Sequence, residues 1–464
     1  MPFISMGECH SPLQITEHRW SDVCVLGVCA LLSDDCMDKG ERMIFRSKIL
    51  TLVGMFIFGC FCVGTSNTPQ AGEVKAKWTC IIYFAGDNFL DWFVQQNLDE
   101  LRKLDSNHNV RAVVLADKTD NRSYLYEVKK ECLAEIPLWR IEQSWDGKEL
   151  NTGDPQTLAT FACWAVERFP AENYLLLLGG YGEGWMGLLH DFNDGAKNVD
   201  ILTLEELELA LKKVTESIKK INDKDRIDIL GLDACYMGMV EVISQVSKYA
   251  KYIIASENEE SLDGWPYDEV LKAFLEDPFK KTPDIASRIA DAYIDSATSS
   301  PKNLANILTI SVVDVERFEK AIEPLKGLVP LLKDINTREI KKMIDIDRLT
   351  PSFTVSAHIG GRYVPYSRHY DLGEFVRIAG LKFRDQPELS QRAQELKDAV
   401  RGAIIKERHQ NLLEKTPELS GLAIFGMGTE IELYKQLAFS QHSHWSDFVE
   451  ERMRALENLF GKSK

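Results

Sequence analysis

One cysteine lies where a short apolar run ends and a glycine-containing segment begins. The segment reads DACYMGMVEV, so Asp233 and Cys235 follow the apolar run that ends at Leu232, and Gly238 opens a helical pattern. In an open parallel sheet, functional side chains gather in loops beyond the carboxyl ends of the strands. A partly exposed thiol there could act as a nucleophile, and the amide dipoles of the following helix are expected to stabilise its thiolate. Taken alone, Cys235 could equally be a buried structural cysteine.

A second loop of unusual composition follows another apolar run. It reads GGYGEGWMG from Gly179 to Gly187, and four glycines precede Trp185. The run before it, from Leu175 to Leu178, is apolar at every residue, which is typical of a strand covered on both faces. The two loops are therefore the places where the sequence predicts chemistry.

Strands and helices must position these loops. From Lys77 onward, short apolar runs alternate with longer amphipathic ones, which predicts parallel strands joined by helical crossovers. The fold class is thus predicted to be α/β, a three-layer sandwich with a central, mostly parallel sheet. Strands are expected at residues 79–84, 110–116, 174–179, 227–232 and 252–256, and helices at residues 89–104, 155–169, 204–221 and 238–248.

Local signals support two of the helices and one extension of the sheet. Asp154 and Pro155 form a helix start, and Thr203 ahead of Glu206 forms a capping box. Alternating apolar and polar residues between 122 and 139 predict a small antiparallel extension.

The remainder of the chain has a different pattern. After about Phe318 it is largely helical, with one further strand expected at 422–425 and a helix at 444–460. We therefore expect an α/β core of residues 77–320 and a largely helical C-terminal region of residues 321–464 that packs on it.

Composition and charge exclude several classes of protein. The 464 residues are 45% hydrophobic and 27% charged, which excludes a disordered or collagen-like chain. The formal charge of -16 argues against a nucleic-acid partner, because no dense run of Lys or Arg overrides it. The ten cysteines are too few for a disulfide scaffold, no C-x-x-C motif is present, and paired zinc ligands at metal spacing are lacking.

The segment 43–65 has the plan of a bacterial secretory signal. Arg46 and Lys48 precede an uncharged run, which is short for a membrane span of about 20 residues. The sequence thus predicts export from the cytoplasm, as a secreted, periplasmic or membrane-anchored protein. An uncleaved membrane anchor is the alternative, and Cys60 offers a lipid-attachment site, although the bulky Phe58 fits that pattern poorly.

Residues 1–42 lie ahead of this signal and carry four cysteines without a clear amphipathic period. Because a signal must stand near the N-terminus, a start at Met43 would be simpler. The alternative is a poorly ordered cytoplasmic tail ahead of an anchor.

Five segments taken together identify a family. They are YFAGDNFLD from Tyr83, NYLLLL with GYGEGW from Asn173, ILTLEELELAL from Ile201, DILGLDACYMGMVEV from Asp228 and IIASENEESLDGWPY from Ile253. In this order they resemble the clostripain family of cysteine peptidases over about residues 78–271. The segment YDLGEF from Tyr370 is more weakly similar. DACYMG together with GWPY makes the resemblance specific. The family fold is the caspase-haemoglobinase sandwich, which agrees with the predicted layers.

The resemblance implies a role for each matching residue. Cys235 matches the nucleophile that attacks the scissile carbonyl to form an acyl-enzyme. Asp233 matches the carboxylate that selects Arg or Lys on the acyl side of the cut bond. Amides near Gly182 resemble oxyanion-stabilising donors. Asp87 and Asn88 match a motif after the first strand, where a scaffolding role is expected.

The sequence departs from the family at one position. The family loop reads His-Gly-x-Gly-Trp, and its histidine is the general acid and base, whereas this chain has Tyr181 there. A phenol titrates near pH ~10 and an imidazole near ~6.5, so Tyr181 exchanges protons poorly at neutral pH. His190 is an alternative base, set against its simpler interpretation as a loop residue. His358 and His369 are expected to be surface or structural residues.

Two functions therefore remain open. The protein is either a peptidase that cuts after Arg or Lys with an unusual proton donor, or a degenerate member that binds basic peptides without cleaving them. The partner is expected to be a peptide or protein with Arg or Lys, and the oligomeric state stays open.

No cofactor is required by this chemistry, although some members of the family need calcium. The stretch DFNDGAKNVD from Asp191 offers several carboxylates, but it lacks the twelfth-position Glu of an EF-hand loop. A solvated loop is expected there, with calcium as the alternative. Lys197 in the same stretch is a candidate site for internal activating cleavage.

Overall fold

The computed structural model describes residues 75–192, 199–300, 307–359, 362–410 and 418–461. These residues belong to one compact unit, Val74–Lys464. The predicted leader, the export signal with Cys60, and Lys197 lie outside the described residues. Within the described ranges, no helix is both long enough and apolar enough to cross a bilayer.

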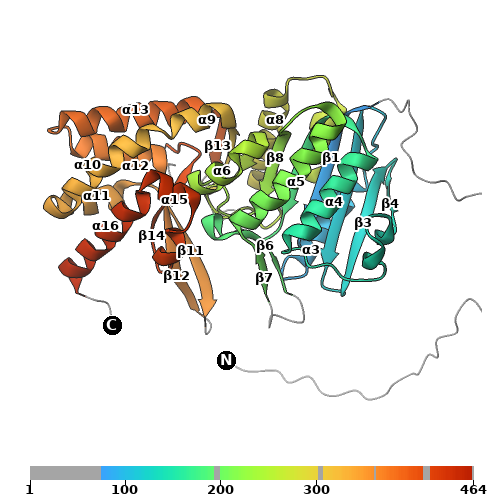
Figure 1. The fold of residues 1–464 in the computed structure, drawn as a ribbon, viewed down its shortest axis with the longest axis horizontal. Coiled ribbons are helices and arrows are strands. Elements are labelled where there is room, and N and C mark those ends of the chain that lie inside the picture. Colours follow the sequence, from blue (N-terminus) through green and yellow to red (C-terminus); the bar gives the residue numbers. More distant parts are fainter. Residues whose placement is uncertain (1–74, 193–198, 301–306, 360–361, 411–417, 462–464) are drawn as a thin grey trace, which may run out of the picture. The chain divides into compact units, whose positions relative to one another are not determined.

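A nine-stranded sheet forms the centre of the fold (Figure 1). Its middle strands run parallel and its two edges are antiparallel. In spatial order the strands are β13 (Ile404–Gln410), β10 (Leu308–Asp314), β9 (Ala250–Ala255), β8 (Ile227–Asp233), β5 (Ala171–Gly179), β1 (Ala76–Phe84), β2 (Val110–Lys118), β3 (Arg122–Lys129) and β4 (Cys132–Glu135).

Helices cover both faces of this sheet. Along β1, Tyr83 belongs to the core shared with α4, α5 and α6, whereas the next residue, Phe84, belongs to the core shared with α3, α7 and α8. This alternation is what a strand between two helical layers requires. The helices are α4 (Pro155–Arg168), α5 (Leu204–Asn222) and α6 (Val240–Val246) on one face, and α3 (Asp91–Leu101), α7 (Tyr267–Leu275) and α8 (Thr282–Ser299) on the other.

The predicted three-layer sandwich is therefore confirmed. In β5, Leu176 faces one helical layer and Leu177 faces the other, as the continuous apolar run indicates. Asp154 caps α4 by accepting a hydrogen bond from the N–H of Gln156, and both hydrogen bonds of the predicted capping box are present at the start of α5. The antiparallel extension is formed by β3 and β4.

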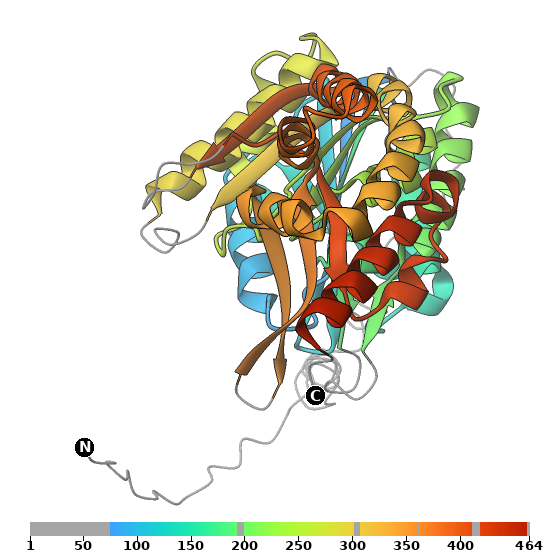
Figure 2. The same cartoon turned by 90° about the vertical axis from the view of Figure 1, so that its left-hand side faces the viewer.

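The C-terminal region contains more strand than the sequence predicts (Figure 2). Its predicted strand and last helix are present as β14 (Ala423–Gly428) and α16 (Trp445–Phe460). β14 joins β11 (Ser352–Ile359) and β12 (Arg362–Asp371) in a separate three-stranded sheet, which the sequence analysis missed. The remaining helices are α9 (Val315–Ala321), α10 (Pro324–Arg338), α11 (Ile340–Leu349), α12 (Leu372–Lys382), α13 (Pro387–Ala403), α14 (Ile431–Tyr434) and α15 (Ala438–Ser443).

Strand β13 was also missed. It reads IIKERHQ, is half-buried throughout and forms the edge of the central sheet, so it carries charged side chains where a buried strand would be apolar. Because β13 pairs with β10, the central sheet draws on both sides of the predicted boundary at residue 320. That boundary stays a prediction.

Candidate active site

The two loops singled out in the sequence meet at the carboxyl ends of neighbouring strands. β5 and β8 pair in parallel with Gly179 beside Asp233. The N–H of Gly180 then donates a hydrogen bond of 3.1 Å to the carbonyl oxygen of Asp233. The glycine-rich loop therefore begins against the strand end that carries Asp233 and precedes Cys235.

Gly182 lies against the backbone of Cys235. A Cβ atom at Gly182 would stand 2.4 Å from the carbonyl oxygen of Cys235 and 2.9 Å from its nitrogen. Any side chain at this position would collide with backbone, so only glycine allows the two loops to approach so closely. The structure thus brings together two of the predicted site residues.

The thiol of Cys235 is half-buried. Its Sγ accepts a hydrogen bond of 3.3 Å from the N–H of Glu260. Burial raises the pKa of Cys235 to about 12, and the charges of Glu259 and Asp233 act in the same direction. The expected stabilisation of the thiolate by a helix is wrong, because α6 begins only at Val240 and the carboxylates oppose ionisation.

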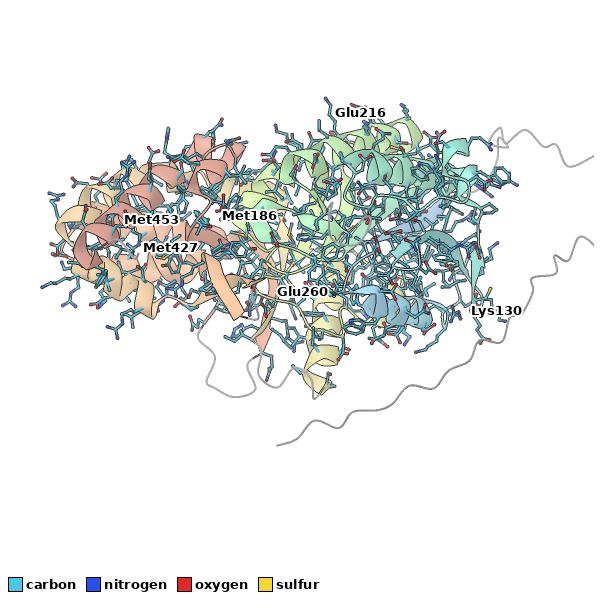
Figure 3. The ribbon with its side chains drawn as sticks, turned by 90° about the horizontal axis from the view of Figure 1, so that it is seen from below. Lys130, Met186, Glu216, Glu260, Met427 and Met453 are labelled. Carbon is cyan, nitrogen blue, oxygen red and sulfur yellow. The ribbon has the colours of Figure 1, made fainter. Side chains whose placement is uncertain are left out.

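Asp233 is buried close to this thiol. The hydroxyl of Tyr267 donates a hydrogen bond of 2.7 Å to its Oδ2, and the carboxyl group of Glu260 interacts with it (Glu260 is labelled in Figure 3). Burial raises the pKa of Asp233, and burial together with Asp233 raises that of Glu260. Two buried carboxyl groups that interact cannot both ionise cheaply, so ionisation of one opposes ionisation of the other.

Tyr181 and His190 lie side by side. Their ring centroids are 5.6 Å apart. The N–H of Leu189 donates to the carbonyl oxygen of Tyr181 at 2.7 Å, and the side-chain amide of Asn88 donates to that of His190 at 2.7 Å. His190 belongs to β6 (Leu188–Asp191), which pairs with β7 (Asp200–Leu202), so it is part of a strand instead of an irregular loop.

The imidazole of His190 is neutral at physiological pH. It is 8% exposed, and burial lowers its pKa to about 4. Its Nε2 lies 3.8 Å from Oε1 of Glu183, whose own pKa is raised by burial. A neutral imidazole can accept a proton, which a neutral phenol does poorly.

His369 lies closer to the site than the sequence suggests. It is fully buried, its ring centroid is 5.8 Å from that of Tyr236, and its Nε2 is 3.0 Å from Oγ of Ser367. Burial lowers the pKa of His369 to about 3. These contacts are consistent with a structural role for His369, which is buried against Tyr236. The other distant histidine, His358, lies in β11.

The sequence alone does not reveal Glu260 and Tyr267 as members of the site. Both stand in the IIASENEESLDGWPY segment that carries the family resemblance. They lie 25 residues after Cys235 and 34 residues after Asp233, respectively. Contacts over such distances follow from the fold, and spacing in the sequence does not reveal them.

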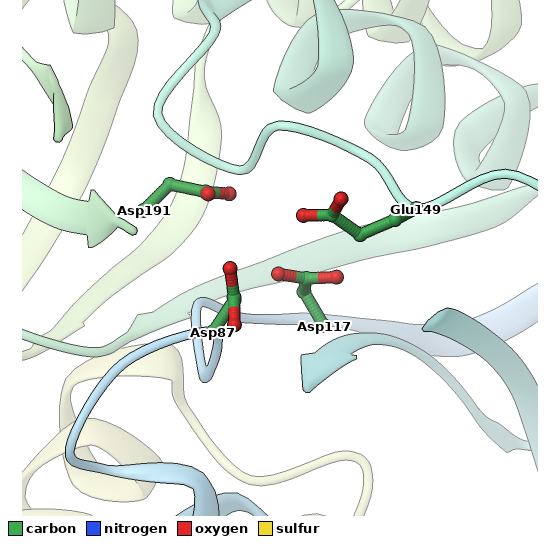
Figure 4. A group of neighbouring side chains, drawn as sticks. All are labelled: Asp87, Asp117, Glu149 and Asp191. Atoms are coloured by element: carbon green, nitrogen blue, oxygen red, sulfur yellow. The ribbon is translucent and has the colours of Figure 1, made fainter. Parts of the chain in front are cut away.

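One group of side chains could hold a metal ion. Among the described residues, Asp87, Asp117, Glu149 and Asp191 offer carboxylate oxygens within 4.8 Å of one another (Figure 4). Only Asp191 comes from the stretch in which the sequence allows calcium, and residues 193–198 of that stretch lie outside the description.

Comparison with known proteins gives consistent results. A family model described as the clostripain family matches residues 82–452. Clostripain from Hathewaya histolytica is 24% identical over 228 residues, which are 44% of this chain and 43% of that protein. The chain therefore matches less than half the length of this curated relative.

Solved structures show the same fold. A secreted C11 cysteine protease from Bacteroides thetaiotaomicron, in complex with an irreversible peptide inhibitor, has a TM-score of 0.58 at 19% identity, covering 80% of this chain and 100% of that one. An inactive zymogen C11 protease from Parabacteroides distasonis has a TM-score of 0.55 at 19% identity, covering 79% and 98%. These likenesses agree with the α/β sandwich described above.

Proposed function

The chain belongs to the clostripain family of cysteine peptidases, and on that premise we propose that it is an endopeptidase that cleaves peptide bonds after Arg or Lys. Cys235 is the nucleophile, and Asp233 receives the cationic side chain of the substrate. The observation that carries this proposal is the buried carboxyl pair of Asp233 and Glu260. Asp233 lies two residues before Cys235, and the N–H of Glu260 donates a hydrogen bond to its thiol.

The carboxyl pair supports selection of a cation. Burial raises the pKa of both groups, so negative charge on the pair is costly without a cation beside it. A guanidinium or ammonium group of the substrate would supply that cation and pair with the carboxylates. A neutral side chain leaves the buried pair without compensation, and differences of this kind discriminate strongly between substrates.

The proton of the thiol needs an acceptor. We assign this role to His190 acting through Tyr181, because their ring centroids are 5.6 Å apart. Once the three groups come within hydrogen-bond distance of one another, the Sγ proton would pass to the phenol oxygen while the phenol proton passes to the imidazole. The thiolate then attacks the scissile carbonyl and forms a tetrahedral intermediate near the amides of the Gly182 loop. Return of the proton to the leaving amine breaks the peptide bond and leaves a thioester on Cys235, which water hydrolyses.

A second function has its own support. The thiol pKa of about 12 and the phenol of Tyr181 both favour a protonated, unreactive Cys235. In this case the same pocket binds peptides with Arg or Lys and releases them uncut. The carboxyl pair would then be the functional centre.

We also propose that the protein acts outside the cytoplasm, on peptide or protein substrates. One solved relative is described as secreted, and residues 43–65 have the plan of an export signal. The net charge of -16 argues against a nucleic-acid partner.

A peptidase assay with matched variants tests these proposals. The purified chain, Cys235→Ala and Tyr181→His are incubated with peptides that carry Arg, Lys or a neutral residue before the cut bond. Cys163→Ala is the control, because Cys163 is a half-buried thiol in α4. Hydrolysis that needs Cys235, tolerates Cys163→Ala and requires Arg or Lys supports the endopeptidase.

Two other results point elsewhere. If the parent chain is inactive and Tyr181→His gains Cys235-dependent hydrolysis, the natural site is disabled and the binding function stands. Peptide binding that is equal for Arg and neutral peptides contradicts both proposals for the pocket.

A further inference from the structure

The C-terminal region has a groove that is lined mainly by β12, β14 and α16. Its volume is about 800 Å³, within the range of about 300–1,000 Å³ that is usual for ligand-binding clefts. We call it the α16 groove. Its apolar lining residues are Pro365, Tyr366, Met427, Met453, Leu456 and Phe460.

The apolar face of α16 runs from the core into this groove. Trp445, Val449, Met453, Leu456 and Phe460 recur at intervals of three or four residues, so they lie on one face of the helix. The first two are fully buried. The last three line the groove, and Phe460 is 72% exposed. The apolar face of α16 thus continues beyond the core, and contiguous apolar surface open to solvent often marks an interaction site.

The side chains of the groove favour an apolar ligand of variable shape. Met427 and Met453, both labelled in Figure 3, have unbranched, flexible side chains that adapt to different partners. The two charged lining residues, Arg368 and Glu457, have opposite signs. The groove therefore offers no net charge to an ionic ligand.

One side of the groove is hydrogen-bonded to the residue that follows Cys235. The hydroxyl of Tyr236 donates a hydrogen bond of 3.1 Å to the carbonyl oxygen of Thr354, a groove residue in β11. Because Tyr236 is the direct neighbour of Cys235 in the sequence, the groove and the thiol are joined by a single side chain.

A second contact joins the groove to the glycine-rich loop. The hydroxyl of Tyr366, a groove residue, donates a hydrogen bond to the carboxyl group of Glu183. Glu183 lies two residues after Tyr181, and its Oε1 is 3.8 Å from Nε2 of His190. The groove therefore adjoins both loops of the candidate active site. An extended peptide advances about 3.3 Å per residue, so a peptide held at Cys235 reaches the groove within a few residues.

We propose that the α16 groove binds an apolar segment of the peptide substrate, a few residues from the cut bond. The continuity of the groove with both loops favours this occupant over a second copy of the chain. The inference rests on the proposed function, because it takes the peptide to be held by Cys235 and Asp233, and it applies whether or not the peptide is cut.

The groove then narrows the class of substrates. The preferred peptides carry Arg or Lys near a run of apolar residues. Burial of these residues in the groove supplies affinity, and it distinguishes among basic peptides that Asp233 alone would bind equally well.

Peptide binding to the full chain with Cys235→Ala tests the inference, because the peptides then stay uncut. The fluorescent peptides carry one central Arg and have polar flanks throughout, or leucines at the third to fifth residue before the Arg, or leucines at the same positions after it. We expect one leucine peptide to bind at least about tenfold more tightly than the polar peptide, since burial of even one Leu is worth that factor. Equal affinity of the three peptides overturns the groove and leaves the role of Asp233 intact.

Matched peptides with Gln in place of Arg separate this inference from the proposed function. A leucine peptide that keeps its advantage but binds equally well with Gln supports the groove and contradicts selection by Asp233. If no peptide binds, both proposals fail.

Substitutions in α16 locate the apolar segment. Leu456→Ser should abolish the advantage of the leucine peptide, whereas Leu459→Ser should leave it unchanged. Leu459 is the matched control, because it lies three residues further along the same helix, is 49% exposed and is not among the lining residues of the groove. If Leu456→Ser fails to fold, Phe460→Ser decides, since Phe460 is exposed. An advantage that both groove variants retain overturns the proposal, and so does Leu456-dependent self-association of the chain that leaves peptide affinity unchanged.

Discussion

The hydroxyl of Tyr267 donates a hydrogen bond of 2.7 Å to Oδ2 of Asp233, which precedes it by 34 residues. This bond ties the first residue of α7 to the carboxyl end of β8. Because Asp233 also interacts with Glu260, this part of the candidate site depends on three side chains from two segments. The orientation of Asp233 is therefore set by residues outside its own strand.

Replacing Tyr267 by Phe should loosen the arrangement around Asp233. Removal of the hydroxyl leaves Oδ2 of Asp233 buried without that donor, and we expect the free energy of unfolding to fall by about 1–3 kcal/mol. Urea unfolding measures the change, and KM for Arg peptides should rise in parallel. Tyr249→Phe is the control, because its hydroxyl bonds to Glu208 in a half-buried position and should cost less. Equal losses in the two variants would contradict a special role for Tyr267.

A methyl group at Gly182 should separate the two loops of the site. In Gly182→Ala the added Cβ would meet the carbonyl oxygen of Cys235 at 2.4 Å, so the backbone must move. Strain of this kind costs about 1–3 kcal/mol, and we expect both stability and any hydrolysis to fall. Gly402→Ala is a matched control, because a Cβ there meets nothing within 4 Å. An active and fully stable Gly182→Ala protein would show that the close approach is dispensable.

Loss of the His190 imidazole should reduce hydrolysis if it accepts the proton through Tyr181. General acid–base catalysis contributes about 10²- to 10⁴-fold, so His190→Gln should lose a factor in this range in kcat. In a Tyr181→His background the same change should cost less than about tenfold, because the new imidazole takes over the role. Additive effects of the two substitutions in the double variant would contradict proton transfer to His190 through Tyr181.

The pH dependence of the reaction offers a separate check on His190. The imidazole accepts a proton only when neutral, and its pKa of about 4 keeps it neutral down to that pH. The acid limb of the kcat/KM profile should therefore have its midpoint near pH 4. The carboxylate of Glu183, whose Oε1 lies 3.8 Å from Nε2 of His190, should shift this midpoint to higher pH. A limb at the ordinary imidazole pKa of about 6.5 would point to a different base.

Glu241 should make the stability depend on pH. Its carboxyl is buried between the N–H of Phe425 at 2.9 Å and the hydroxyl of Tyr434 at 2.7 Å, and burial raises its pKa from 4.5 to about 7. The folded state thus holds the proton more tightly than the unfolded chain. This stabilisation is fully present below pH 4.5 and is lost as the pH rises through about 7.

The size of the effect is about 3 kcal/mol by linkage. We expect the difference in free energy of unfolding between the parent and Glu241→Gln to fall by up to that amount between pH 4 and pH 8. Urea unfolding across this range measures it. Glu216→Gln, an exposed residue of α5 labelled in Figure 3, should leave the slope unchanged.

The sequence predicts the parallel centre of the sheet because burial on both faces demands continuous apolar runs, as in β5. It also predicts where the chemistry lies, since functional loops follow such strands. It does not predict β13, in which two apolar residues are followed by five polar or charged ones at the half-buried edge of the sheet. Charged edge strands carry little periodic signal, so a helix or loop is an equally good interpretation.

In the candidate site too, some of the contacts can be predicted from the sequence and others cannot. Cys235, Asp233 and Gly182 stand in two recognisable loops, and their proximity follows from neighbouring parallel strands. The contacts of Glu260 and Tyr267, and the convergence of the four carboxylates, depend on how distant segments approach one another. Spacing along the chain carries no signal for such contacts.

The backbone just after Cys235 is hydrogen-bonded to a residue much later in the sequence. The N–H of Ala423 donates a hydrogen bond of 2.8 Å to the carbonyl oxygen of Gly238. Strand β10 likewise finds its second neighbour only in β13. Synthesis proceeds from the N-terminus, so a nascent chain has made its thiol long before it can complete the surroundings of that thiol. We therefore expect hydrolytic activity only after β13 and β14 have been synthesised and have paired with the earlier part of the chain.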